Sequence, residues 1–246
     1  MCFSTTASFG ASAILTVAGV AALSKVKVKS QIPFAAIPIF FAFQQFTEGF
    51  VWLSLIHPEY NHWQNIPITI FLVLAQAFWP FWVPFSFLLI EKDEKRKMVL
   101  KILLGLGSVV SIFLAYRVLF YPVSAAITPL HIHYTLSFPY KLFGNVISIF
   151  YFLVTIVPPF LTGGKRMTSL GLLNLMSFIV TVVLFENYVI SVWCFFAALI
   201  SWEVLLAMKD LNVKKQSDTF EDTLIKAIDA LHIEIDKIKS KFQQRQ

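Results

Sequence analysis

Charged residues are scarce in this chain of 246 residues, where Asp, Glu, Lys and Arg together make up 14%. Hydrophobic residues make up 57%, and Phe alone occurs 26 times. Soluble domains usually carry about a quarter of charged residues. The shortage of charge therefore excludes an ordinary soluble fold and indicates a protein that crosses a membrane several times.

Cysteine is almost absent too, since only Cys2 and Cys194 occur. Two cysteines without a CxxC pair exclude a disulfide framework and give no sign of a redox or zinc motif. The opening MCFSTTASFG also lacks Lys and Arg, so we expect no cleaved signal peptide. The hydroxyl groups of Ser4, Thr5 or Thr6 are suited to cap a first helix that begins here.

Seven stretches are long and apolar enough to cross a membrane, which takes about 20 residues at 1.5 Å each. They lie at residues 4–23, 32–56, 66–90, 98–121, 140–161, 168–185 and 188–208. We interpret the last two as a helical hairpin, because one helix of about 40 residues would overshoot a bilayer. The sequence thus predicts an all-α membrane protein with seven transmembrane helices.

Basic residues gather in alternate connections between these stretches. The clusters comprise Lys25, Lys27, Lys29, Lys92, Lys95, Arg96, Lys97, Lys165, Arg166, Lys209, Lys214 and Lys215. Because cytoplasmic loops hold the excess of Lys and Arg, the N-terminus is predicted outside and the C-terminus in the cytosol. The net charge of +6 then reflects orientation, so the expected partner is the lipid bilayer and not nucleic acid.

Polar residues inside the predicted spans are the candidates for a site, because an ionised residue there costs about 2.5 to 3.5 kcal/mol. Gln44, Glu48 and Trp52 follow one another at intervals of four and share one helical face. This stripe is either an interhelical hydrogen-bond clasp or the wall of a ligand pocket, and both interpretations stay open. Further candidates for the same pocket are Gln76, Arg117 and Glu186.

Arg117 has two interpretations of its own. It can snorkel to the outer headgroups, or it can pair with Glu48 or Glu186 and close a polar pocket. Pro80 and Pro84, in the stretch WPFWVP, should kink the third span and free backbone carbonyl groups, which would favour a cavity or a hinge.

The histidines ahead of the tail all fall in the predicted outer loops: His57, His62, His131 and His133. The HxH pair places both imidazoles on one side of an irregular or extended loop. These four residues are candidates for a divalent-metal site, and solvated surface is the alternative. Cys2, His131 and His133 are likewise candidates for a nucleophile and a base in catalysis. No cofactor is evident.

Two seven-helix classes are excluded by residues that are missing. A retinal protein needs a Lys in its seventh helix, and residues 188–208 contain none. Membrane hydrolases related to alkaline ceramidase and the adiponectin receptors carry HxxxH in the seventh helix and a His in the second. This chain has neither, so that similarity ends at the number of helices.

The composition changes after residue 208, which divides the chain into a transmembrane domain, 1–208, and a charged cytosolic part, 209–246. Asp218 and Glu221 are spaced as in a capping box. Heptad a and d positions are then filled by Leu224, Ile228, Leu231, Ile235, Ile238 and Phe242. The pattern predicts a coiled coil that forms a homodimer, or an amphipathic helix on the inner leaflet.

The stretches MCFSTTASFGASAILTVAGVAAL, PFAAIPIFFAFQQFTEGFVW and AQAFWPFWVP resemble a family of uncharacterised bacterial multi-pass membrane proteins. Its members begin MCFSATASF, and this chain departs from that start by Thr at position 5. The resemblance implies a multi-pass cell membrane protein that is located in the bacterial inner membrane. It implies no known activity.

From the residues, we expect a non-enzymatic seven-helix protein that binds or senses a small ligand or ion in an outward-facing polar pocket. The alternatives are a membrane-embedded metal-dependent or cysteine hydrolase and a transporter.

Overall fold

The computed structural model describes residues 4–128, 131–137, 141–184, 193, 196 and 200–211. The chain forms two units, Met1–Met208 and Lys209–Gln246. The second unit is described only at residues 209–211, so the predicted coiled coil at 224–242 lies outside the described residues.

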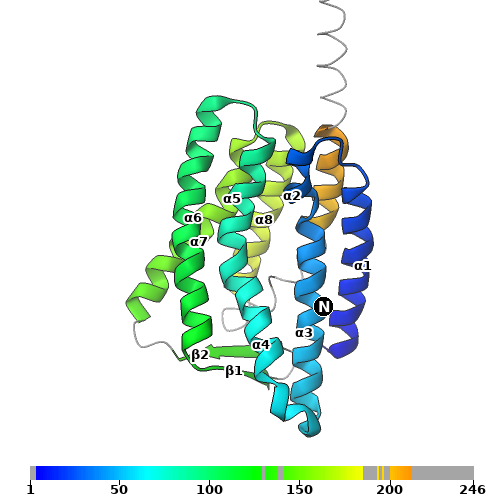
Figure 1. The fold of residues 1–246 in the computed structure, drawn as a ribbon, viewed down its shortest axis with the longest axis vertical. Helices are drawn as coiled ribbons and strands as arrows, with labels where there is room; N and C mark the ends of the chain where they lie inside the picture. Colours follow the sequence, from blue (N-terminus) through cyan, green and yellow to red (C-terminus); the bar gives the residue numbers. More distant parts are fainter. Residues whose placement is uncertain are drawn as a thin grey trace, which may run out of the picture. The chain divides into compact units, whose positions relative to one another are not determined.

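Helices form most of the first unit (Figure 1). They are α1 (Thr5–Leu23), α2 (Ile32–Ala35), α3 (Ile37–Ile56), α4 (Asn65–Leu72), α5 (Trp79–Ile90), α6 (Glu94–Phe120), α7 (Lys141–Leu161) and α8 (Lys165–Leu184). Residues 200–211 are helical as well. Short 3-10 segments, η1 (Lys29–Gln31) and η2 (Pro58–Trp63), precede α2 and α4. A π-helical segment, η3 (Val73–Phe78), joins α4 to α5.

Five of the described helical stretches are long and apolar enough to cross a membrane. They are Thr5–Leu23, Lys29–Ile56, Asn65–Ile90, Glu94–Phe120 and Lys165–Val183, and they overlap five of the seven predicted spans. A shorter apolar helix, Val146–Leu161, overlaps the predicted fifth span. The described structure thus has the helices of a membrane protein, while the number seven and the orientation stay predictions.

The first helix begins where its hydroxyl residues predict. The Ser4 side chain accepts a hydrogen bond from the Ala7 amide at 3.2 Å, which caps α1. Small residues on one face of α1 pack against α3, and Ser12 Oγ donates to the Ala42 carbonyl at 2.8 Å. The opposite face exposes large apolar side chains such as Val17, as expected of a helix facing lipid.

Within the described part of the chain, the connection between α6 and α7 departs from the predicted fold class. Strands β1 (Val123–Thr128) and β2 (His131–Leu136) form an antiparallel hairpin, with register running from Val123 opposite Leu136 to Thr128 opposite His131. The expectation of an entirely α-helical domain is wrong here. The hairpin depends on long-range packing, because Ile132 and Tyr134 are buried against Phe71 of α4 and its neighbours.

Candidate functional site

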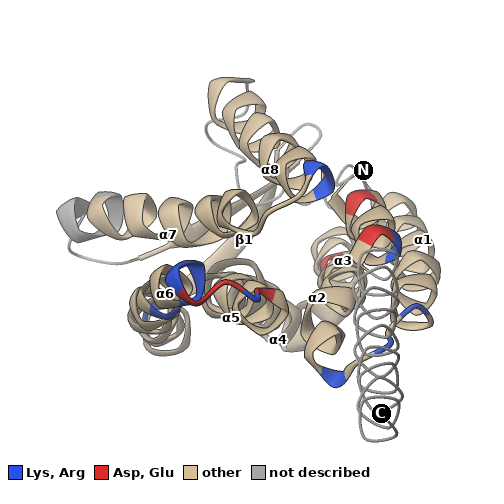
Figure 2. Ribbon diagram, turned by 90° about the horizontal axis from the view of Figure 1, so that it is seen from above, with Lys and Arg blue, Asp and Glu red and all other residues tan. Residues whose placement is uncertain are grey.

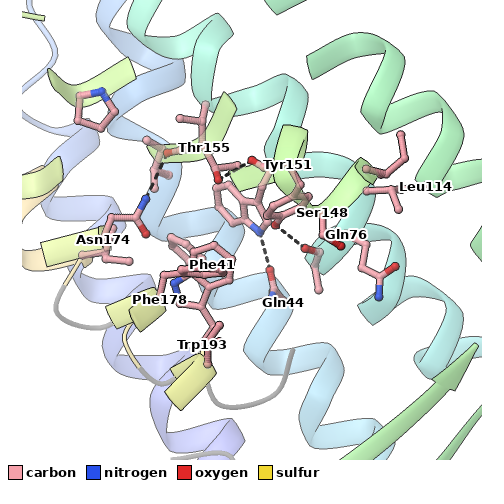
Figure 3. Close-up of a pocket in the computed structure, with 18 of the residues that line it drawn as sticks. Phe41, Gln44, Gln76, Leu114, Ser148, Tyr151, Thr155, Asn174, Phe178 and Trp193 are labelled. Atoms are coloured by element: carbon pink, nitrogen blue, oxygen red, sulfur yellow. Dashed lines mark hydrogen bonds between the residues drawn. The ribbon is translucent and has the colours of Figure 1, made fainter. Parts of the chain in front are cut away.

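A cavity of about 610 Å³ lies inside the first unit. Its walls come from α3, η3, α5, α6, α7 and α8, with Leu136 of β2 and with Trp193, Ile200 and Val204 (Figure 3). The aromatic side chains in the wall are Phe41, Trp79, Phe87, Tyr151, Phe178 and Trp193. The polar ones are Gln44, Gln76, Arg117, Ser148, Thr155 and Asn174. An apolar wall with a few polar groups is the usual composition of a ligand pocket.

The wall at η3 is shaped by a proline. In a π-helix each carbonyl accepts from the amide five residues later. For Ala75 that residue is Pro80, which has no N–H, so the carbonyl of Ala75 loses this donor. The Tyr151 hydroxyl of α7 donates to this oxygen at 2.8 Å and takes the place of the missing amide. The predicted effect of Pro80 on the third span thus appears as a π segment that lines the cavity.

A second proline has the same effect on α7. Pro159 lies inside this helix, so the carbonyl of Thr155, four residues earlier, lacks its helical donor. The Asn174 side chain of α8 reaches this oxygen from the cavity wall, with Nδ2 donating at 3.2 Å (Figure 3). Proline-freed carbonyls therefore explain why a Tyr and an Asn are placed in the wall of this cavity.

Aromatic contacts hold the rest of the wall together. The Trp79 indole donates to Gln44 Oε1 at 2.9 Å, and its ring stacks on Phe41 with centroids 4.1 Å apart. On the other side, Trp193 packs against Phe178 with centroids 5.2 Å apart and donates from Nε1 to Ser177 Oγ at 3.1 Å. These contacts tie α3 to α5 and Trp193 to α8.

Three of the six predicted pocket residues come together at this cavity. Gln44, Gln76 and Arg117 all line it, and they belong to α3, η3 and α6. Among the lining residues that the structure describes, Arg117 is the one with a formal charge, and its side chain is half-buried.

Glu48 and Trp52 do not line the cavity. Glu48 is fully buried, and the Gln45 amide of the same helix donates to its Oε2 at 3.1 Å. Trp52 belongs to a hydrophobic cluster with Phe71 and Ile132. Glu186 lies outside the described residues, so an ion pair between Arg117 and Glu48 or Glu186 stays a prediction.

The histidines lie in two connections, the one between α3 and α4 and the one between α6 and α7. His57 Nδ1 lies 3.2 Å from Glu59 Oε1, and His62 Nδ1 lies 3.1 Å from the Glu59 carbonyl oxygen. His131 and His133 share one side of β2, where burial lowers the pKa of the His131 imidazole. Among the described residues no three His, Cys, Asp or Glu side chains come together. Metal binding by these histidines stays a prediction, and Cys2, the other catalytic candidate, lies outside the described residues.

Sequence reasoning missed Ser148, Tyr151, Thr155, Asn174 and Trp193. The spacing of these residues in the sequence could have indicated them, because several cavity-lining residues recur at intervals of four. On α7 they are Ile147, Tyr151, Thr155 and Pro159, and on α8 they are Leu170, Asn174, Phe178 and Val182. Residues in such a row share one face of a helix. A polar residue within the row would have indicated that this face lines a cavity.

Comparison with known proteins assigns the chain to a family. No curated protein and no solved structure matches it. Residues 1–219 match a family of unknown function (DUF6629), which covers the whole helical unit. This confirms the resemblance to an uncharacterised family, and the chain therefore belongs to this family of unknown function.

Proposed function

We propose that this protein is a multi-pass membrane protein that binds a small, mostly apolar molecule in the cavity between α3, α5, α6, α7 and α8. The cavity itself carries the proposal. Its volume of about 610 Å³ falls within the range of about 300–1,000 Å³ that is typical of ligand pockets. Its wall combines aromatic rings with a few polar groups, which is the composition expected for such a ligand.

The arrangement of the prolines supports a built cavity rather than a packing defect. Pro80 and Pro159 each remove a backbone N–H donor beside the cavity. Tyr151 and Asn174, which lie on other helices, donate hydrogen bonds to the freed carbonyls. Backbone that is not regular helix is tolerated at membrane depth only where the protein buries it or where it lines a cavity.

The finer topology is part of the same proposal: seven spans, an outer N-terminus, a cytosolic C-terminus and the bacterial inner membrane. It is supported by the basic residues, which mark the helix ends facing the viewer in Figure 2, among them the starts of α6 and α8. In this orientation the β1–β2 hairpin is on the outside. We also retain the homodimer through residues 224–242 as a proposal.

Photolabelling in lipid nanodiscs tests the function. A long-chain alcohol that carries a diazirine is expected to label the cavity residues of α7 and α8 in a saturable way, competed by the unlabelled alcohol. Labelling of lipid-facing residues should not saturate. Replacing Ser148 with Phe puts a ring into the cavity wall and should remove the saturable fraction.

The matched control is Ile149→Phe, one residue further along α7, at a side chain that is 60% exposed and does not line the cavity. It should keep wild-type labelling. If labelling by the alcohol and by the corresponding acid is never saturable, or if both variants behave like the wild type, the proposal is wrong.

A further inference from the structure

We propose that the ligand of this cavity is a single-chain lipid anion, whose acidic headgroup binds Arg117 and whose chain runs along α7. The inference rests on the proposed function, because it names the class of molecule that the same cavity takes. It follows from how charge, hydrogen-bonding groups and apolar surface are distributed along the cavity.

Charge is found at one end of the cavity. Arg117 lies three residues before Phe120, the last residue of α6, so it is about 4.5 Å from the helix end at 1.5 Å per residue. Gln76 of η3 and Leu114, one turn of α6 before Arg117, line the cavity as well (Figure 3). An Arg near a helix end is placed at the level of lipid headgroups. A guanidinium there suits a carboxylate or phosphate, which it binds through two parallel hydrogen bonds.

The middle of the cavity offers few hydrogen bonds to a ligand. The Tyr151 hydroxyl donates to the Ala75 carbonyl, and Asn174 Nδ2 donates to the Thr155 carbonyl. Gln44 Oε1 accepts from the Trp79 indole. Since each of these groups already makes one hydrogen bond to the protein, fewer partners remain for the many polar groups of a sugar or a nucleotide, and burying such groups without partners is costly. An alkyl chain has no such need.

The length of the cavity fits a chain. Ile147 and Pro159 both line it from α7, and their separation of twelve positions corresponds to about 18 Å of helix. This is close to half of the ~30 Å hydrocarbon core of a bilayer, the depth of one leaflet. Because α6 leads into the β1–β2 connection and α7 starts from it, Arg117 and Ile147 belong to the same end. The end near Pro159 is lined by apolar residues such as Phe87 and Leu170.

Two sources supply this chemistry, a free long-chain carboxylate and a lysophospholipid with a terminal phosphate. The test displaces the saturably bound photoreactive palmitate analogue from protein in phosphatidylcholine nanodiscs. The competitors are palmitate, palmitoyl lysophosphatidate and the alcohol with the same chain. We expect at least one anion to compete at about tenfold lower concentration than the alcohol, which corresponds to about 1.4 kcal/mol. Whichever anion competes better identifies the source.

Substitution of Arg117 gives the second readout. Arg117→Gln should abolish the preference for the anions over the alcohol. Arg117→Lys should retain part of this preference, because Lys keeps the positive charge and lacks the planar guanidinium that makes two parallel hydrogen bonds. Lys101→Gln removes the same charge from an exposed position on α6 and should change nothing. If Arg117→Gln does not fold, the ratio of the competing concentrations of anion and alcohol in the wild type still tests the inference.

Equal competition by anions and alcohol in the wild type would overturn the inference and leave the proposed function standing. The same holds if the preference for anions persists in folded Arg117→Gln protein. Absence of saturable labelling by any of these lipids would overturn both.

Discussion

At the scale of single residues, the polar side chains of the membrane part fall into different environments. Gln44 and Glu48 are four residues apart on α3, yet only Gln44 lines the cavity. The Gln44 amide oxygen bonds Trp79 across helices, whereas the Glu48 carboxyl is fully buried and bonded by Gln45 within α3. The hydrogen bond between Gln44 and Trp79 joins α3 to α5, as an interhelical clasp would, and Gln44 also lines the cavity.

Tyr151 carries the first residue-scale prediction. Replacing it with Phe removes the donor to the Ala75 carbonyl, which Pro80 has already deprived of an amide. A buried acceptor without a donor costs about 1–3 kcal/mol, and we expect a loss of that size in the free energy of unfolding. Denaturant titration in detergent measures it.

Tyr116→Phe is the control for this change, since Tyr116 is on α6 with its side chain 48% exposed. It should alter the free energy of unfolding by less than about 0.5 kcal/mol. Equal effects of the two substitutions would show that the hydroxyl of Tyr151 does not compensate for Pro80.

At the scale of elements, prolines and one glycine determine how α5 and α6 meet. Pro84 lies inside α5, so the carbonyl of Pro80, four residues earlier, has no helical donor. Helix α6 meets α5 closely at Gly107, where a Cβ would overlap that carbonyl oxygen and lie 3.4 Å from Pro84 Cγ. The absence of a side chain at Gly107 therefore permits this approach.

We predict that Gly107→Ala forces α5 and α6 apart. Overpacking of this kind typically costs about 1–3 kcal/mol, and the contact here is with backbone, which cannot rotate away. On the same helix, Gly105→Ala meets nothing within 4 Å and should be neutral or stabilising by up to about 1 kcal/mol. Thermal unfolding of both variants in detergent tests the pair, and a stable Gly107→Ala protein would contradict the close approach.

At the scale of the whole molecule, the hairpin and η2 occupy one end of the first unit, and the α5–α6 connection occupies the other (Figure 1). Asn61 is in η2, His133 is in β2 and Lys95 is in the first turn of α6. The two ends of the unit can therefore be tested separately for exposure to the outside of the cell.

Cysteine labelling in intact cells checks the proposed orientation. In a background with Cys2 and Cys194 changed to Ser, a membrane-impermeant thiol reagent should label Asn61→Cys and His133→Cys and leave Lys95→Cys unlabelled. The reason is that Lys and Arg clusters are retained on the cytoplasmic side. If Lys95→Cys alone were labelled, the proposed orientation would be wrong, and the basic clusters would face the outside of the cell.

The amino-acid sequence by itself determined where the chain crosses from polar to apolar surroundings. Five predicted spans coincide with described helices, and Ser4 caps the first of them. These properties are local, because the transfer free energy of a span is a sum over its own residues, and a cap needs only the next few amides. The resemblance to an uncharacterised family was likewise stated from the sequence, and the match over residues 1–219 confirms it.

Only the tertiary structure decided which residues share the cavity. Spacing fixes the face of a helix that a residue occupies, but the neighbour of that face depends on how all the helices pack. Gln44, Gln76 and Arg117 therefore meet Tyr151 and Asn174, while Glu48 and Trp52 do not join them. The carbonyls that Pro80 and Pro159 free find donors on other helices, and the β1–β2 hairpin is stabilised by contacts with distant residues. Such long-range contacts have no counterpart in any short stretch of the sequence.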